Sequence, residues 1–314
     1  MRLKIKKKSG RKVVRTRVLM ARDIRNKHIL DTSAWNNLYD DPGSDRLIKI
    51  LRTKIVLPTA LAISELAAIE NPDRRHGIIR LMKILGHDNR PLAMPNQLII
   101  MACQGYSSRA QNLTINAGDE AEGAWIALNH PELLDGEAQK LTLTFNEERE
   151  DIFRRYFEGL RDLLQPQFKR GLARPQSFKA LVERYTVNDD LIYKFVNEIY
   201  ERAVGQPLRR GDLWELVRSL ACWRLFLLSY VYAAHRRAIK QQGFGWKNNA
   251  GALDLWSAVY LPFSDTFVTH DKRQRRALKV IDRASTRPSR LVSYNQWREE
   301  LLSTPRQTSS KRKR

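Results

Sequence analysis

The stretch "LPFSDTFVTHDKRQRRAL", residues 261–278, places an aspartate on each side of a short strand-like segment. Asp265 comes directly before "TFVT", and Asp271 follows it after one intervening histidine. The basic run that follows has helical character, and an aspartate directly before a helix accepts hydrogen bonds from free backbone N–H groups. A helix cap is therefore the simplest role for Asp271. A second role depends on whether the fold brings other carboxylates to the same place.

The composition of the chain predicts binding to a polyanion. Its 314 residues include 56 Lys or Arg against 34 Asp or Glu, which gives a formal net charge of +22. Nucleic acid is the usual partner of such a chain, and an anionic membrane surface is the second candidate. The membrane alternative lacks a basic amphipathic helix with exposed aromatic side chains, so we expect nucleic acid and no membrane. A protein partner or a homo-oligomer is left open.

Cysteine use and apolar segments indicate a cytoplasmic protein. Cys103 and Cys222 are the only cysteines, and each lies among apolar neighbours, which predicts buried thiols in a reducing compartment. The N-terminus lacks the continuous apolar segment of a signal peptide. The most apolar helix candidate, residues 213–235, carries three charged residues, which predicts a core helix and not a membrane span.

Both ends of the chain are basic. Residues 1–27 hold twelve Lys or Arg and one Asp, and residues 304–314 form a second basic tail. Such runs are typical of solvated arms and of arms that bind phosphate groups, and the two roles are compatible.

The pattern between the two ends predicts one α/β domain interrupted by a helical insertion. Short strand candidates alternate with helical spacing over residues 28–95 and again over residues 250–303, which favours a parallel sheet flanked by helices. Residues 96–249 show helical spacing throughout and end in the connector "QQGFGWKNN". We expect this block to decorate the α/β core and to shape access to its cleft.

Several carboxylates lie where a parallel sheet would gather them. Asp31 ends the first strand candidate and Asp271 follows a later one, so both are expected at the same edge of the sheet. Asp254 stands at a helix start, where a cap is the alternative role. Glu65 is the only charged residue between Leu57 and Ile69, and a lone carboxylate on an apolar helix is costly unless a partner satisfies it.

Converging carboxylates repel one another and resist ionisation unless a counter-charge is present. A divalent cation supplies that charge, and Mg²⁺ or Mn²⁺ prefers carboxylate and water oxygens. Two such ions activate water and stabilise the leaving oxygen in phosphodiester cleavage. The carboxylates therefore predict a Mg²⁺ or Mn²⁺ site.

The segments "HILDTSAW", "ISELAA" and "DLWSAVYLPFSDTFVTHDKRQ" together resemble a PIN domain, the fold of many metal-dependent ribonucleases. The resemblance covers residues 28–85 and about 250–303, and the long helical block between them departs from the family. It implies a PIN-like parallel sheet and catalytic, metal-binding roles for four acids: Asp31, Glu65, Asp254 and Asp271. It further implies supporting hydroxyls at Thr32, Ser33 and Thr269, with Asp265 as a second-tier metal ligand.

Basic and aromatic residues near these acids are candidates for contact with nucleic acid. Lys272, Arg273, Arg275 and Arg276 follow Asp271 directly, and they fit a phosphate-binding role and a solvated helix face equally well. Trp246 and Phe244 in the connector are able to stack on bases, although simple packing explains them too.

The leading functional hypothesis is a Mg²⁺- or Mn²⁺-dependent endoribonuclease that cuts RNA with metal-activated water. The alternative is a catalytically inactive PIN-like module that binds nucleic acid within an RNA-processing or defence assembly. The presence of all four acids favours the enzyme, because an inactive site is free to lose one.

Overall fold

A computed structural model of the chain describes residues 27–87, 90–108, 119–134, 178–185, 189–236, 250–283 and 289–303, together with scattered positions between 136 and 155. The basic N-terminal arm before Lys27, the basic tail from residue 304 and the connector with Phe244 and Trp246 lie outside the described residues.

Four parallel strands form the sheet at the centre of the fold. They are β1 (Lys27–Leu30), β2 (Ile55–Val56), β3 (Thr266–Val268) and β4 (Arg290–Val292), in the order β2-β1-β3-β4. The predicted α/β class with a parallel sheet is confirmed. Strand β1 pairs with β3 in a register that sets Ile29 opposite Phe267, so a strand from each end of the chain lies at the sheet centre.

Helices connect and cover these strands, as parallel pairing requires. The helices before residue 96 are α1 (Thr32–Asp40), α2 (Ser44–Leu51), α3 (Ala60–Ala67) and α4 (Pro72–Leu85). After residue 250 come α12 (Ala252–Trp256), the 3₁₀ segment η5 (Ser257–Phe263), α13 (Lys272–Asp282) and α14 (Tyr294–Ser303). The apolar segment that begins at Ala252 is thus an α-helix continued by a 3₁₀ segment.

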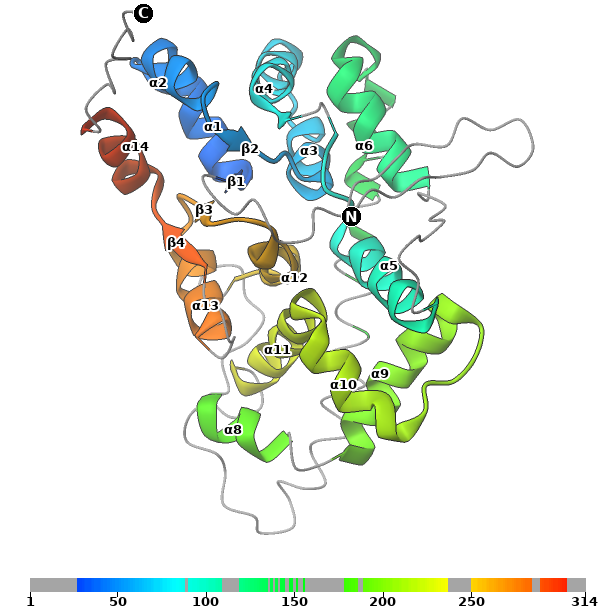
Figure 1. Ribbon diagram of the computed structural model, residues 1–314. Helices are drawn as coiled ribbons and strands as arrows, with labels where there is room; N and C mark the ends of the chain where they lie inside the picture. The colour runs from blue at the N-terminus through cyan, green and yellow to red at the C-terminus, as the bar shows by residue number, and fades with distance from the viewer. Residues whose placement is uncertain are drawn as a thin grey trace, which may run out of the picture.

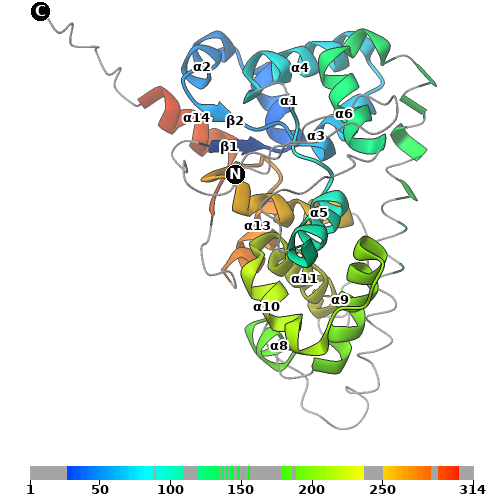
Figure 2. The same ribbon diagram turned by 45° about the vertical axis from the view of Figure 1, so that its right-hand side comes forward.

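The described elements between residues 95 and 234 are all helical. They are α5 (Pro95–Ser108), α6 (Asp119–Asn129), η2 (Pro131–Leu133), α8 (Phe178–Tyr185), α9 (Asp189–Val204), η3 (Arg210–Asp212), α10 (Leu213–Ser219) and α11 (Ala221–Ala234). Figures 1 and 2 show α8, α9, α10 and α11 gathered at one end of the molecule, with α1, α2, α3, α4 and α6 at the other.

The most apolar segment of the sequence is broken into two helices. Helix α10 ends at Ser219, Leu220 has extended backbone angles (φ −110°, ψ 96°), and α11 begins at Ala221. The prediction of one continuous helix over residues 213–235 is wrong. No single helix of the described residues has the length and apolarity to cross a membrane, and the pair Arg210–Ser219 and Ala221–Ala233 meets those criteria only jointly, with a bend of 101°.

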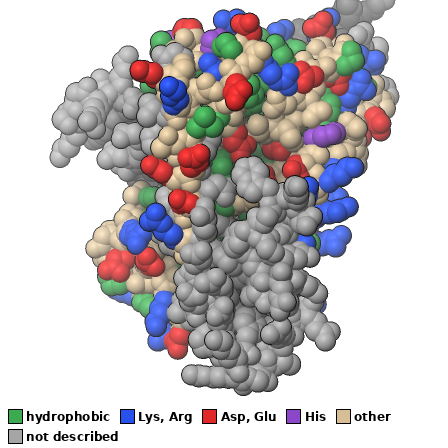
Figure 3. Space-filling model, turned by 180° about the vertical axis from the view of Figure 1, so that it is seen from behind, with side chains coloured by type: hydrophobic (Ala, Val, Ile, Leu, Met, Phe, Trp, Pro, Cys, Tyr) green, Lys and Arg blue, Asp and Glu red, His purple; other side chains and the backbone are tan. Residues whose placement is uncertain are grey.

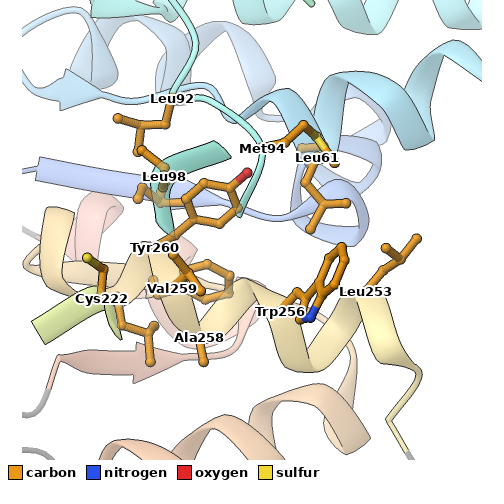
Figure 4. Packing of buried hydrophobic residues seen from close by; sticks show 14 of the residues in the cluster. Leu61, Leu92, Met94, Leu98, Cys222, Leu253, Trp256, Ala258, Val259 and Tyr260 are labelled. Carbon is orange, nitrogen blue, oxygen red and sulfur yellow. The ribbon is translucent and has the colours of Figure 1, made fainter. Parts of the chain in front are cut away.

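Buried apolar side chains join the helices of the long central block to the α/β core. Helix α11 packs against η5 and α13, and the buried Trp256 of α12 donates from Nε1 to the hydroxyl of Tyr230 on α11 at 3.2 Å. Within the core, Tyr260 of η5 donates to the backbone carbonyl of Ala93 at 3.0 Å. Figure 4 shows Leu253 and Trp256 of α12 beside Leu61 and Met94. Both cysteines are buried free thiols, as predicted, and Trp223 donates to the Sγ of Cys103 at 3.1 Å.

Helix α14 is held to the opening helices by a buried acid. Asp41, between α1 and α2, accepts hydrogen bonds from Arg298 Nε at 2.5 Å and from Tyr294 Oη at 2.8 Å. The Arg298 guanidinium, the Gly43 N–H and the Tyr294 hydroxyl outweigh burial and lower the pKa of Asp41. This contact fixes the last described helix beside the loop that follows α1.

Candidate functional site

Asp31 lies at the carboxyl end of the central strand β1. It is the N-cap of α1, and its Oδ1 accepts a hydrogen bond from the backbone N–H of Ala34 at 2.8 Å. Its own N–H donates to the carbonyl of Val268, the last residue of β3, at 3.0 Å. The main chain itself therefore ties Asp31 to the end of the neighbouring strand.

Two hydroxyls converge on the Asp31 carboxylate. Thr269 Oγ1 donates to Oδ2 at 2.7 Å, and Ser33 Oγ lies 2.8 Å from Oδ1 and 2.9 Å from Oδ2. Ser33 Oγ in turn accepts from the backbone N–H of His270 at 2.8 Å. The loops after β1 and β3 are thus joined by side-chain hydroxyls on both sides of Asp31.

Asp271 caps α13, as its sequence position predicts. Its Oδ1 accepts from the backbone N–H groups of Arg273 at 2.5 Å and of Gln274 at 2.9 Å. Its own backbone N–H donates to Thr269 Oγ1 at 3.1 Å. One threonine hydroxyl therefore connects the carboxylate of Asp31 with the backbone of Asp271.

The environment of Asp31 opposes its negative charge. Burial raises the pKa of Asp31 to about 6, although hydrogen bonds from Thr269, Ala34 and Ser33 act in the opposite direction. The nearby carboxylate of Asp271 raises this pKa further, because two like charges resist ionising together. A cation placed between the two acids would remove both penalties.

Glu65 is linked to the same region through the residue after Asp31. It is partly buried on α3, whose other side chains are apolar except for Ser64, and its Oε2 accepts a hydrogen bond from Thr32 Oγ1. Thr32 is therefore one partner that satisfies this lone carboxylate. Thr32 stands in the first turn of α1, so Glu65 is held beside the carboxyl end of β1.

Asp254 is partly buried near the start of α12. Its Oδ2 accepts from the backbone N–H of Gly251 at 2.9 Å, which is the cap-like role given as its alternative. Helix α12 packs against α13, the helix that Asp271 caps, and Figure 4 shows two of its apolar side chains beside Leu61 of α3. Asp254 therefore stands on a helix that neighbours the helix of Asp271.

Asp265 lies at the opposite end of β3 from Thr269. Its Oδ2 accepts from the backbone N–H of Lys27 at 3.0 Å, at the start of β1. Four residue steps separate it from Thr269, which is about 13 Å at the usual rise of a parallel strand. We therefore leave Asp265 outside the proposed site.

The donor chemistry at Asp31 fits a hard divalent cation. A carboxylate offers about four lone-pair positions, and the Ala34 N–H, the Thr269 hydroxyl and the single Ser33 proton use three. One lone-pair position remains for a cation. The other predicted ligands also offer carboxylate oxygens, which are the ligands that Mg²⁺ and Mn²⁺ prefer. In the described part of the chain, however, no three His, Cys, Asp or Glu side chains stand together as a group that could hold a metal ion.

The basic residues after Asp271 differ in exposure. Lys272, Arg273 and Arg276 are exposed, and Arg275 is partly buried. Sequence reasoning overlooked His270, whose backbone N–H binds Ser33. A contact made by a backbone group leaves no trace in the residue type, so no sequence signal could have found it.

Comparisons of the chain with protein-family models, with curated proteins and with solved structures found no match in any of the three.

Proposed function

We propose that this protein is a divalent-metal-dependent endoribonuclease of the PIN type, which hydrolyses phosphodiester bonds of single-stranded or loop RNA. The hydrogen bond from Thr269 to Asp31 is the observation that carries the proposal, because it joins the ends of two adjacent parallel strands at a partly buried acid. Functional groups gather at that edge in parallel sheets. A strongly perturbed pKa in such a place is a mark of functional sites as well.

In this proposal Asp31, Glu65, Asp254 and Asp271 hold the ions. When bound, Mg²⁺ or Mn²⁺ would activate a water and stabilise the leaving oxygen. Hydrolysis forms a bond between the water oxygen and phosphorus and breaks the bond from phosphorus to the 3′ oxygen, which leaves with a proton. The products are a 5′-phosphate and a 3′-hydroxyl.

Other residues of the chain act on these acids and not on the substrate. Ser33 and Thr269 hold the Asp31 carboxylate in one orientation, and Thr32 does the same for Glu65. Such partners of metal ligands fix the direction of the lone pairs and so tune affinity for the ion.

The decisive experiment is cleavage of end-labelled RNA and DNA by the full-length protein with Mg²⁺, with Mn²⁺ and with chelator. We expect metal-dependent cleavage of RNA with 5′-phosphate products, and its loss in Asp31→Asn and Asp271→Asn. Melting with and without Mn²⁺ provides a second readout, because an ion that binds only the native state stabilises it by about 2.7 kcal/mol at a hundred times its dissociation constant.

Asp265→Asn is the matched control, because the same change is made at the other end of β3. This variant should retain cleavage and the Mn²⁺-induced rise in melting temperature. RNA binding without cleavage and without any effect of Mn²⁺ on melting would overturn the enzyme in favour of an inactive binding module.

A further inference from the structure

Four exposed bases form a single row along α13. Lys272, Arg276, Lys279 and Arg283 are spaced by four, three and four residues, which places them within about 60° of one another around the helix. The opposite side of the helix is buried and carries Gln274, Ala277, Leu278 and Ile281. We call the four bases the α13 row; it begins directly after Asp271 and extends about 16 Å at 1.5 Å per residue.

The fold does not account for this row. Within the described ranges, none of its four side chains has an ion pair or a side-chain hydrogen bond. Like charges three or four residues apart on a helix repel each other. Lys272 also stands in the first turn, which holds no acid and where the helix dipole disfavours a cation. The only acid within α13, Asp282, is buried.

We propose that the α13 row binds the phosphodiester backbone of a single-stranded nucleic acid and aligns it with the acids at the carboxyl end of the sheet. This inference rests on the proposed function for the identity of the substrate as RNA. The binding surface itself follows from the charge, exposure and spacing of the four side chains.

The geometry favours one strand over a duplex. A single row of cations on a convex helix follows one line of phosphates, and nothing in the row provides a second line for the opposite strand. The row starts one residue after the Asp271 cap, so a backbone lying along it has one end beside the proposed site. Figure 3 shows basic side chains along the edge of the molecule where α13 lies, with several acidic side chains nearer the middle of that face.

The test is RNA binding by a variant with Lys272→Gln, Arg276→Gln, Lys279→Gln and Arg283→Gln, measured in chelator so that cleavage plays no part. Glutamine keeps the helix propensity and removes the charge. Each phosphate contact to a single strand contributes about 0.7 to the slope of log affinity against log salt. We expect the slope to flatten by roughly 3 and the affinity at 0.1 M salt to fall about 100-fold.

A matched control removes the same charge elsewhere. Lys49, Arg52, Lys194 and Arg218 are exposed on or next to α2, α9 and α10, and their change to Gln leaves the α13 row intact. At 0.1 M salt, charges more than about 10 Å from the bound RNA are largely screened from it. The control variant should therefore lose only a few-fold in RNA affinity. Equal losses in the two variants would overturn the row as a specific surface.

Thermal melting of both variants separates a binding role from a structural one. The row variant should melt at or above the temperature of the unsubstituted protein, because repulsion along α13 is relieved. A clear drop in its melting temperature, with near-normal RNA affinity, would show that the four bases serve the fold and would overturn the inference.

Three probes identify the ligand. A single-stranded RNA should bind through the row. If the row variant loses affinity for single-stranded DNA to the same extent, recognition of the shared backbone is supported. If its affinity for a duplex falls equally, the single-strand assignment is overturned. Loss of affinity in the row variant, in a protein that cleaves under no metal condition, would reject the proposed nuclease and retain the surface.

Discussion

Thr269 donates a 2.7 Å hydrogen bond to Asp31 Oδ2 across 238 positions of sequence. The same hydroxyl oxygen accepts from the backbone N–H of Asp271 at 3.1 Å. The hydroxyl of Thr269 therefore links two of the proposed metal ligands through two hydrogen bonds. The side chain of Thr269 is fully buried, so a water molecule does not take over the hydrogen bonds of its hydroxyl.

Thr269→Val removes this hydroxyl and keeps the shape of the side chain. We expect RNA cleavage to fall about 10- to 100-fold, as for other partners of metal ligands, with a matching loss of Mn²⁺ affinity in melting experiments. Thr53→Val is the control, since Thr53 is exposed and its hydroxyl, among the residues that the structure describes, bonds only the local carbonyl of Ile50. Unchanged metal affinity in Thr269→Val would show that Thr269 does not position Asp31.

Asp31→Asn should stabilise the protein in the absence of metal. Burial and Asp271 raise the pKa of Asp31, so its ionised form is disfavoured in the native state at neutral pH. Asparagine is neutral and caps helices about as well as aspartate, so the bond from Ala34 can be retained. We expect about 1–2 kcal/mol of added unfolding free energy in chelator at pH 7.5, measured by urea denaturation. A less stable variant would contradict the charge argument.

Asp282 should make stability depend on pH. It is 3% exposed, burial raises its pKa to about 6, and its Oδ1 has no hydrogen-bond partner among the described residues. The native state therefore binds more protons than the unfolded state between about pH 4 and 6, and the unfolding free energy falls as pH rises through that window. Above about pH 6 Asp282 is ionised in the native state as well as in the unfolded state. The unfolding free energy has then fallen by up to roughly 3 kcal/mol because of this group.

Asp282→Asn should remove this contribution. Denaturant titrations from pH 4 to 7 should show the variant gaining stability relative to the unsubstituted protein as pH rises, with a constant difference above about pH 6. Two stability curves that stay parallel from pH 4 to 7 would exclude the titration of Asp282 as a cause.

Removal of the basic N-terminal arm should weaken RNA binding and flatten its salt dependence. Strand β1 begins at Lys27, whose N–H binds Asp265, so the truncation should stop at residue 26 and spare the sheet. It removes eleven Lys or Arg, and each one that contacts a phosphate contributes about 0.7 to the salt slope. An unchanged slope in filter-binding or anisotropy measurements would make the arm a solvated segment without a role in binding.

Local patterns in the sequence were sufficient to predict where the strands and most helices lie. The runs "HIL", "IVL", "TFV" and "LV" are short and bounded by polar or turn residues, and each contains strand residues. Asp31 and Asp271 were predicted at strand ends because a cap and a strand terminus are both local features. The break at Leu220 was missed, since the residues around it keep apolar helical spacing and contain neither Gly nor Pro.

The sequence by itself determined the α/β class, the positive charge and the four carboxylates that lie within or beside apolar elements, because these depend on residue type and short-range spacing. Only the tertiary structure decided that β1 and β3 are neighbours, since strand order is set by packing between distant segments. That order brings Thr269 to Asp31 and Thr32 to Glu65, and it leaves Asp265 at the other end of β3. Strand order depends on contacts such as the one between Asp31 and Thr269, 238 positions apart, and short-range side-chain patterns do not encode contacts at that separation.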